Sequence, residues 1–315
     1  MILVTGAAGF IGYHVARALA ERGDEVVGID NLSEYYDPSL KRSRLEQLSS
    51  QTRFRFERLD LCDYDGLRRL FDHHPIERVC HLAAQAGVRY SIENPFAYQK
   101  SNNEGFLNVI ELARSRKAAN FVYASSSSVY GASRRLPFAE DDPADCPISL
   151  YAATKRANEL VAHCYSHLHG LPCSGLRFFT VYGPWGRPDM ALFIFTRAIL
   201  EGRPIDVYNH GRMRRNFTYI DDIVKGVLLT IDHPVPCGIY NIGNSRAETL
   251  LDFIEALERC LGRKAQRNML PMQAGDVAET VADIARIRAL GYEPATNISE
   301  GIGKFVAWYR EYYRV

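Results

Sequence analysis

The sequence predicts an α/β fold, a doubly wound parallel sheet with helices on both faces, followed by a smaller C-terminal α/β lobe. Three observations predict it. Aliphatic runs alternate with segments of helical spacing over the first 180 residues, and a glycine-rich turn joins the first such pair. After that the alternation becomes less regular, and Gly, Pro and Arg become more frequent. Alternation of this kind is typical of βαβ units, whose strands run parallel.

Each element of the first half follows from its composition. Runs rich in β-branched and aliphatic residues predict strands; in chain order they are MILVTG, EVVGID, RFRFERLDL, RVCHLAA and NFVYASS. The segments GFIGYHVARALAERG, YDGLRRLFDHH and NEGFLNVIELARSRK have helical spacing, and Gly23 closes the first of them. A helix starting near Tyr151 precedes a further strand, CSGLRFFTVYG. We expect GPWGRPDM and YNHGRMRRNFTYIDD to form loops that line a cleft.

Composition restricts the functional classes. The chain has 315 residues and a formal net charge of +1, so charge gives no argument for binding nucleic acid or a membrane surface. No apolar run approaches the roughly 18 residues of a membrane span, and MILVTG enters the glycine turn without the basic leader of a signal peptide. The seven scattered cysteines lack a C-x-x-C pair, which favours reduced thiols in the cytoplasm. His163 and His167 flank Cys164 without the glutamate of a metal motif, so we expect no metal there.

The first turn has the spacing of a dinucleotide site. GAAGFIG (residues 6–12) follows a strand and opens a helix, where glycine permits a tight turn and close approach to a pyrophosphate, and the helix N-terminus offers N–H groups to the phosphates. Asp30 ends the second strand 18 residues after Gly12. An acid there accepts from the ribose hydroxyls and repels a 2′-phosphate, which favours NAD. Lys41 and Arg44 keep NADP open.

Tyr151 and Lys155 form the candidate acid–base pair. They lie four residues apart in SLYAATKRANEL, so both project from one face of a helix. Tyrosine alone is a poor base near pH 7, because its ordinary pKa is about 10. A lysine ammonium one turn away, together with a positive nicotinamide ring, favours the phenolate and lowers that pKa.

With these motifs and the serine run YASSSSVYG (123–131), the sequence resembles, over essentially its whole length, the extended short-chain dehydrogenase/reductase superfamily of NAD-dependent nucleotide-sugar epimerases and dehydratases. The resemblance implies that Ser126 hydrogen-bonds the sugar hydroxyl whose proton Tyr151 removes. It also implies that HLAAQAGVR (81–89) borders the cofactor and that RFFTVYGPWGRP (177–188) contacts the substrate. The cofactor-binding residues that it implies are Gly6, Gly9, Phe10, Ile11, Gly12, Asp30, Asn31, Lys41, Asp60, Leu61, Ala83, Ala84, Gln85, Tyr151 and Lys155.

The serine run contains no acid, and this absence indicates the reaction. Superfamily members that eliminate water carry an Asp-Glu pair in this motif, and those that decarboxylate a uronate carry a Glu. Ser127 and Ser128 occupy those places here, and hydroxyls do not readily take or give the protons that elimination requires. We therefore expect an epimerase, which oxidises carbon 4 of a sugar to a ketone, turns the keto-sugar over and returns the hydride to its other face.

Three segments, 30–45, 183–195 and 271–284, resemble those of the UDP-glucuronate 4-epimerases, which interconvert UDP-glucuronate and UDP-galacturonate. A uronate carboxylate requires a cation and hydroxyl donors, and the residues able to supply them are Arg187, Thr180, Ser127 and Ser128. Further substrate contacts implied by the resemblance are Arg89, Arg215 at the pyrophosphate, and Gln273 and Asp276 near uridine or its ribose. Two roles stay open for Arg212 and Arg214: contacts with the pyrophosphate, or places in a solvated basic loop. Two roles also stay open for Phe178, Phe179 and Tyr182: packing in the core, or contacts with the ligand.

Three alternatives stay open: a UDP-galactose 4-epimerase or another nucleotide-sugar epimerase, a decarboxylating synthase of UDP-xylose, and an NAD-sensing binding protein. The missing Glu argues against the second, and intact Ser126, Tyr151 and Lys155 argue against the third. We expect residues 1–178 to form the NAD-binding domain, with later segments at about 214–244 able to return to it, and residues 179–315 to form mainly the nucleotide-sugar-binding lobe. The resemblance also implies a homodimer, through the helices at about 104–116 and 151–168.

Overall fold

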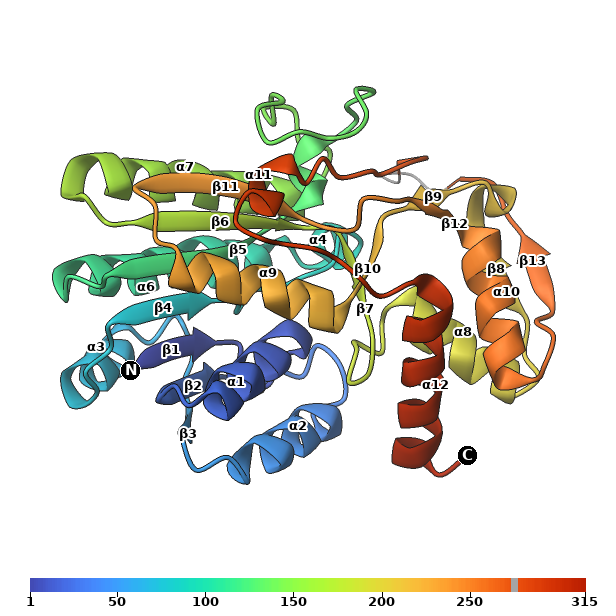
Figure 1. Ribbon diagram of the computed structural model, residues 1–315, viewed down its shortest axis with the longest axis horizontal. Coiled ribbons are helices and arrows are strands. Elements are labelled where there is room, and N and C mark those ends of the chain that lie inside the picture. The colour runs from blue at the N-terminus through green and yellow to red at the C-terminus, as the bar shows by residue number, and fades with distance from the viewer. Residues whose placement is uncertain (273–276) are drawn as a thin grey trace.

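Seven parallel strands form the main sheet (Figure 1). The computed structural model describes residues 1–272 and 277–315. In sheet order the strands are β11 (Cys237–Ile242), β6 (Cys173–Phe178), β5 (Asn120–Ser126), β4 (Arg78–His81), β1 (Ile2–Thr5), β2 (Val26–Asp30) and β3 (Phe54–Arg58). Every neighbouring pair is parallel. The predicted fold class is confirmed.

The strand order places a ligand-binding crevice at the centre of the sheet. From β1 the chain winds through β2 to β3 on one side, and from β4 through β5 to β6 on the other. The direction of winding therefore reverses between β1 and β4. In open α/β sheets, ligands bind outside the carboxyl ends of the strands at such a switch point.

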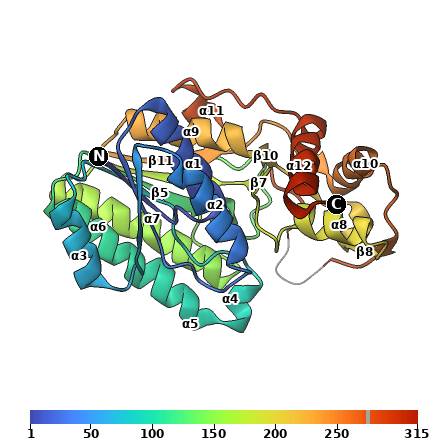
Figure 2. The ribbon, with the colours of Figure 1, turned by 90° about the horizontal axis from the view of Figure 1, so that it is seen from below.

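Helices cover both faces of the sheet, as Figure 2 shows. One face carries α1 (Phe10–Arg22), α2 (Ser39–Ser49) and α9 (Ile220–Asp232), and the other carries α3 (Tyr64–His73), α6 (Gly105–Ser115) and α7 (Leu150–His169). Successive residues of β1 pack on opposite faces of the sheet: Ile2 and Val4 pack in the core on the α1 side, and Leu3 packs in the core on the α6 side. Burial on both faces explains why this strand is a continuous apolar run.

The smaller lobe lies at the right of Figure 1. It contains the helices α8 (Ala191–Leu200), α10 (Leu250–Leu261) and α12 (Ile298–Tyr313) and the parallel pair β8 (Ile205–Val207) and β13 (Arg267–Met269). Two further pairs lie at its junction with the main sheet: β7 (Thr180–Tyr182) with β10 (Phe217–Tyr219), and β9 (Arg214–Arg215) with β12 (Glu248–Thr249). The short helices are α4 (Tyr90–Glu93), α5 (Pro95–Tyr98), α11 (Ala285–Arg288), and η1 to η3 at Gln99–Glu104, Ser127–Tyr130 and Tyr208–Gly211.

The two expected loops differ in outcome. Residues 183–190 are a loop, as predicted. The segment 208–222 contains instead β9, β10 and the start of α9. Its strands pair with β12 and β7, which are distant in sequence, so local composition did not reveal them. Within residues 1–272 and 277–315, no helix combines the length and hydropathy needed to cross a bilayer.

Candidate active site

The glycine turn closes on itself and opens α1 toward the switch point. Gly6 has φ 71°, and a Cβ there would lie 2.9 Å from the backbone of Ala83. A Cβ at Gly12 would lie 2.0 Å from the Gly6 carbonyl oxygen. The helix begins at Phe10, and its N-cap Gly9 supplies no side-chain hydrogen bond. The first N–H groups of α1 are thus left for an anion, which fits the pyrophosphate of a dinucleotide.

The end of β2 is arranged for a ribose with free hydroxyls. Asp30 is 8% exposed, and the Lys41 ammonium lies 3.7 Å from its Oδ1 atom. Arg44 is fully buried and donates to the backbone carbonyls of Ala8 (2.8 Å) and Trp185 (2.7 Å). Arg44 is therefore a structural link between the cofactor turn and the loop 183–190, and is not available to a 2′-phosphate. The geometry favours NAD.

Two other predicted cofactor residues bind each other beside this site. Asn31 Nδ2 donates to Asp60 Oδ2 over 2.8 Å, which joins the ends of β2 and β3. Leu61 follows and is buried. The amide of Ala83 donates to Thr5 Oγ1 over 3.0 Å, so the segment after β4 is fixed against β1.

Asn102, which was not among the predicted site residues, fixes the next part of this segment. Its side chain accepts from the Gln85 amide (2.8 Å) and donates to the Gln85 carbonyl (3.0 Å). The same amide nitrogen contacts Thr154 Oγ1 at 3.0 Å, which connects the segment that contains Ala84 and Gln85 to α7. The only local signal was a polar residue in a helical run.

Strand β5 and helix α7 bring the three predicted catalytic residues together. Ser149 caps α7 by accepting from the Ala152 amide over 3.1 Å, and Tyr151 and Lys155 follow on the first turns. Ser126 ends β5, and its side chain lies near enough to the Tyr151 hydroxyl to lower the pKa of that phenol. Lys155 Nζ donates to the Ala124 carbonyl over 2.9 Å.

Burial controls the protonation of this triad. It raises the pKa of Tyr151, while the hydrogen bond from Ser126 and the positive charge of Arg187 act in the opposite direction. It also lowers the pKa of Lys155 to about 8, against the charge of Glu159. In the protein chain, the desolvation of the buried phenol therefore outweighs the groups that favour the phenolate. The lowering of the Tyr151 pKa by Lys155 together with a nicotinamide ring stays a prediction.

A buried ion pair lies behind the catalytic residues. Arg177 on β6 makes two hydrogen bonds to Glu159 on α7, of 2.9 and 2.8 Å, and both side chains are 2% exposed. Ser125, next to the catalytic serine, donates to the same carboxylate over 2.6 Å. The pair therefore fixes the end of β5 against α7. Sequence reasoning missed it, although a glutamate one turn after Lys155 in an apolar helix was a usable signal.

The groups proposed for a uronate carboxylate come from three segments: the serine run, β7 and the loop 183–190. Ser127 and Ser128 begin η2, and Thr180 begins β7. All three side chains are half-buried, and in the described ranges their hydroxyls form no hydrogen bond. The Arg187 guanidinium contacts Asp189.

The remaining residues that the sequence suggested as ligand contacts lie in different surroundings. Arg89 is exposed, with its guanidinium 5.5 Å from the centre of the Tyr208 ring in the smaller lobe. Arg215 donates to the carbonyls of Arg214 and Ala278. Gln273 and Asp276 lie outside the described residues. Phe178, Phe179 and Tyr182 are 8, 4 and 5% exposed and belong to the core.

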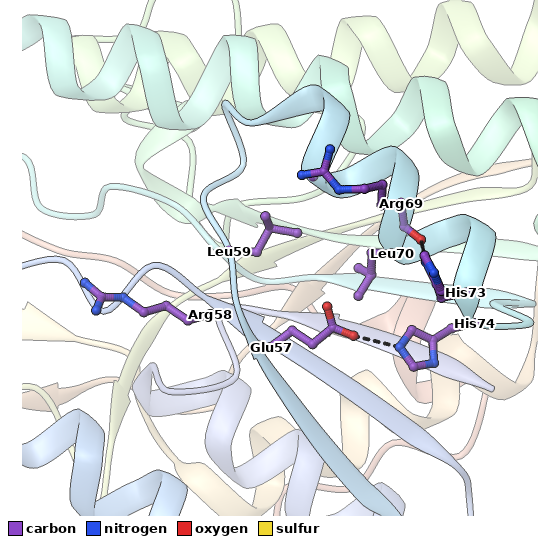
Figure 3. A pocket seen from close by; sticks show the side chains of 8 residues that line it. Glu57, Arg58, Leu59, Arg69, Leu70, His73 and His74 are labelled. Atoms are coloured by element: carbon purple, nitrogen blue, oxygen red, sulfur yellow. Dashed lines mark hydrogen bonds and ion pairs between the residues drawn. The ribbon is translucent and has the colours of Figure 1, made fainter.

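A separate hollow of about 490 Å³ lies away from this chemistry, at the outer edge of the sheet beside β3 and α3 (Figure 3). Leu59 and Leu70 line it, and Glu57 is paired with His74 across 2.7 Å. None of the catalytic residues lines it. We place the active site at the switch point instead, because the reactive groups converge there.

A protein-family model, the NAD dependent epimerase/dehydratase family, matches residues 2–243. The chain belongs to this family. Curated relatives of this family member include UDP-glucuronate 4-epimerase 4 of Arabidopsis thaliana, 49% identical, with 99% of this chain and 76% of that protein covered. A probable UDP-glucuronate 4-epimerase of Rhizobium meliloti is 46% identical, with 99 and 97% covered.

A solved epimerase structure extends the likeness to three dimensions. The UDP-glucuronic acid 4-epimerase of Bacillus cereus, crystallised with UDP-glucuronic acid and NAD, matches with a TM-score of 0.93 and 35% identity over 99% of both chains. The family resemblance expected from the motifs is confirmed.

Proposed function

We propose that the protein catalyses the reversible epimerisation of UDP-glucuronate to UDP-galacturonate at carbon 4, with NAD as a tightly bound cofactor. The observation that carries the proposal is the convergence of Ser126, Tyr151 and Lys155 beside a serine pair that lacks any carboxylate. NAD supplies a hydride acceptor that returns the hydride within the same cycle. The relatives named above support the choice of the uronate.

The side chains at the end of β5 and the start of α7 would perform the proton chemistry. Tyr151 takes the proton of the carbon 4 hydroxyl as that carbon is oxidised, and returns it after the ring has turned. Ser126 holds the same oxygen by a hydrogen bond, so that proton transfer occurs at a fixed geometry. Lys155, buried beside the Ala124 carbonyl, places a positive charge near the phenolate and the cofactor.

The cofactor and substrate assignments follow the same placement. The N-terminus of α1 and the segment 83–85 would hold NAD, with Asp30 on its ribose. Arg187, Thr180, Ser127 and Ser128 would hold the carboxylate, and Arg89 and Arg215 the nucleotide end. The 4-keto intermediate is a β-keto acid, which loses carbon dioxide when its carboxyl bond aligns with the carbonyl π system. We infer that the hydroxyl donors and Arg187 keep the carboxylate out of that alignment.

Incubating the purified protein with UDP-glucuronate without added reductant, followed by mass spectrometry and proton NMR, tests the proposal. UDP-galacturonate of unchanged mass is the expected product. Tyr151→Phe is expected to reduce kcat about a thousandfold, since general acid–base groups contribute factors of about 10² to 10⁴. Unchanged turnover in Tyr151→Phe, product only from UDP-glucose, or a pentose as the main product contradicts the proposal.

The hydroxyl and Arg187 assignment has its own test. Ser127→Ala, Ser128→Ala and Arg187→Ala are each expected to raise the yield of UDP-pentose from UDP-glucuronate, because the carboxylate is held less firmly. An unchanged pentose yield in all three variants contradicts the assignment.

We also propose a cytoplasmic homodimer. Leu107 on α6 and Leu160 on α7 are 47 and 53% exposed, on two helices that pack against each other. Exposed apolar side chains on a helix pair are suited to a four-helix contact with a second copy. The seven cysteines, all free thiols within the described chain, suit a reducing compartment.

A further inference from the structure

The Arg187 guanidinium is held by two residues that the proposed mechanism does not use. Its Nε atom donates to Asp189 Oδ1 over 3.0 Å, and its Nη2 atom makes a second bond to Oδ2. Tyr35 donates its hydroxyl to the same Oδ2 over 3.1 Å. The guanidinium carbon lies 5.9 Å from the centre of the Tyr35 ring. The cation is therefore fixed by both a carboxylate and an aromatic ring.

These contacts join two loops that are far apart in the sequence. Tyr35 belongs to residues 31–38 after β2, and Arg187 and Asp189 belong to residues 183–190 after β7. Burial and the negative charge of Asp189 raise the pKa of Tyr35, so that this phenol stays a donor. The carboxylate thus has a fixed position independent of any substrate.

Asp189 leaves part of the guanidinium outside the ion pair. A guanidinium has five N–H donors in one plane, and Asp189 takes only the Nε and Nη2 edge. The side chains of Arg187 and Asp189 are 21 and 30% exposed, so the pair is reached by solvent and is not part of the core. The Arg187 Nη2 atom and the Tyr98 hydroxyl lie 3.8 and 3.6 Å from the point that a Cβ at Gly87 would occupy. The centres of the Tyr98 and Tyr151 rings are 6.1 Å apart, so the cation lies near the catalytic tyrosine.

We propose that Asp189, held by Tyr35, is a positioning and specificity-determining residue: it orients Arg187 for the uronate carboxylate and partly cancels its charge. This inference rests on the proposed function. The keto-sugar has to turn over between the two hydride transfers, so its carboxylate has to leave one set of contacts. An uncompensated cation strengthens the ground-state complex without helping a later step, which lowers KM and does not raise kcat.

Asp189→Asn separates charge from shape, because it keeps the size and one acceptor oxygen. We expect UDP-glucuronate to bind about tenfold more tightly, a change typical of one strengthened charged contact, and kcat to fall by a similar factor. The affinity for UDP-glucose, which lacks the carboxylate, is expected to change less than about twofold. Tyr35→Phe is expected to act in the same direction with a smaller change, since it only frees the carboxylate to move.

Dissociation constants are measured calorimetrically on NAD-loaded protein in a Tyr151→Phe background, and KM and kcat in the otherwise wild-type protein. Glu201→Gln is the matched control, because Glu201 forms a similar two-residue pair with Arg203 on the exposed surface. Equal changes for both sugars, or no change for either, in Asp189→Asn overturn the inference. A wild-type protein that turns over UDP-glucose but not UDP-glucuronate overturns the proposed function instead, so the two failures are distinguishable.

Discussion

The ion pairs Arg177–Glu159 and Arg187–Asp189 share one bidentate geometry but not one environment. The first has both side chains 2% exposed, and its carboxylate also accepts from Ser125 and Arg156. The Arg177 guanidinium lies 4.7 Å from the centre of the Tyr130 ring. The second pair is partly exposed, and among residues 1–272 and 277–315 only Tyr35 adds a hydrogen bond to its carboxylate.

This difference separates a structural role from a binding role. A buried pair that is fully hydrogen-bonded has no capacity left for a ligand, and removing one partner strands the other charge away from water. A partly exposed pair loses less when it is broken, because water replaces the partner. We therefore expect substitutions at the first pair to change stability, and substitutions at the second pair to change substrate affinity.

The largest expected effect is on folding. Glu159→Ala is expected to lower the free energy of unfolding by about 3–5 kcal/mol, since Arg177 is left as an unpaired buried cation. Burial alone raises the pKa of Glu159, but Arg177 and the other donors outweigh it and the pKa is lowered. The carboxylate therefore stabilises the fold above its unfolded-state pKa, and this contribution is lost as the pH falls through the lower folded value.

Urea denaturation of Glu159→Ala and Asp189→Ala at pH 7 measures the contrast directly. Asp189→Ala is expected to cost less than about 1 kcal/mol, the range of exposed ion pairs. Similar losses in the two variants contradict the division of roles. The same experiment at pH 4 is expected to narrow the gap between wild type and Glu159→Ala.

These pairs also mark how far the sequence could be interpreted. The parallel sheet, the glycine turn and the Tyr151–Lys155 spacing depend on local composition and helical periodicity, so they were predictable. Glu159 and Arg177, by contrast, meet only because β6 packs against α7. Tyr35 and Asp189 meet across two loops far apart in sequence, and no local pattern specifies such a contact. The raising of the Tyr151 pKa by burial was not predictable for a related reason, because burial is a property of the whole fold.

The next largest effect is expected at Lys155, a buried cation without the ion-pair partner that Arg177 has. Arg177 has Glu159, whereas Lys155 is 2% exposed and, in the part of the chain that the structure describes, donates only to the Ala124 carbonyl. Its pKa is lowered by burial from 10.5 to about 8, which corresponds to a cost on the order of 3 kcal/mol at neutral pH. Lys155→Met is expected to abolish activity and raise the free energy of unfolding by about 2 kcal/mol, after allowance for the lost hydrogen bond.

The pH dependence checks the origin of that gain. Between pH 8 and 10.5 the unfolded chain holds a proton on Lys155 that the folded chain has lost, so wild-type stability rises with pH through this window. The advantage of Lys155→Met over wild type is expected to shrink there in parallel urea titrations. A constant difference across that window contradicts the assignment of the cost to a buried charge, as does a variant less stable than wild type at pH 7.

The smallest expected effect is on the pH dependence of kcat. It is expected for the pair Arg187–Asp189 and not for Arg177–Glu159. Arg187 lowers the pKa of Tyr151 and Arg177 is not among the groups that shift it. If Tyr151 acts as the base, kcat at saturating UDP-glucuronate rises as the pH passes through its pKa. Arg187→Met removes a positive charge and is expected to move this rise in kcat to higher pH.

Ser126→Ala is expected to move the rise in kcat in the same direction and further, because the Ser126 hydrogen bond lowers the Tyr151 pKa more than the Arg187 charge does. Arg203→Met, at the remote surface pair, serves as the control. If kcat rises over the same pH range in Arg187→Met as in Arg203→Met, the charge of Arg187 does not act on the catalytic phenol.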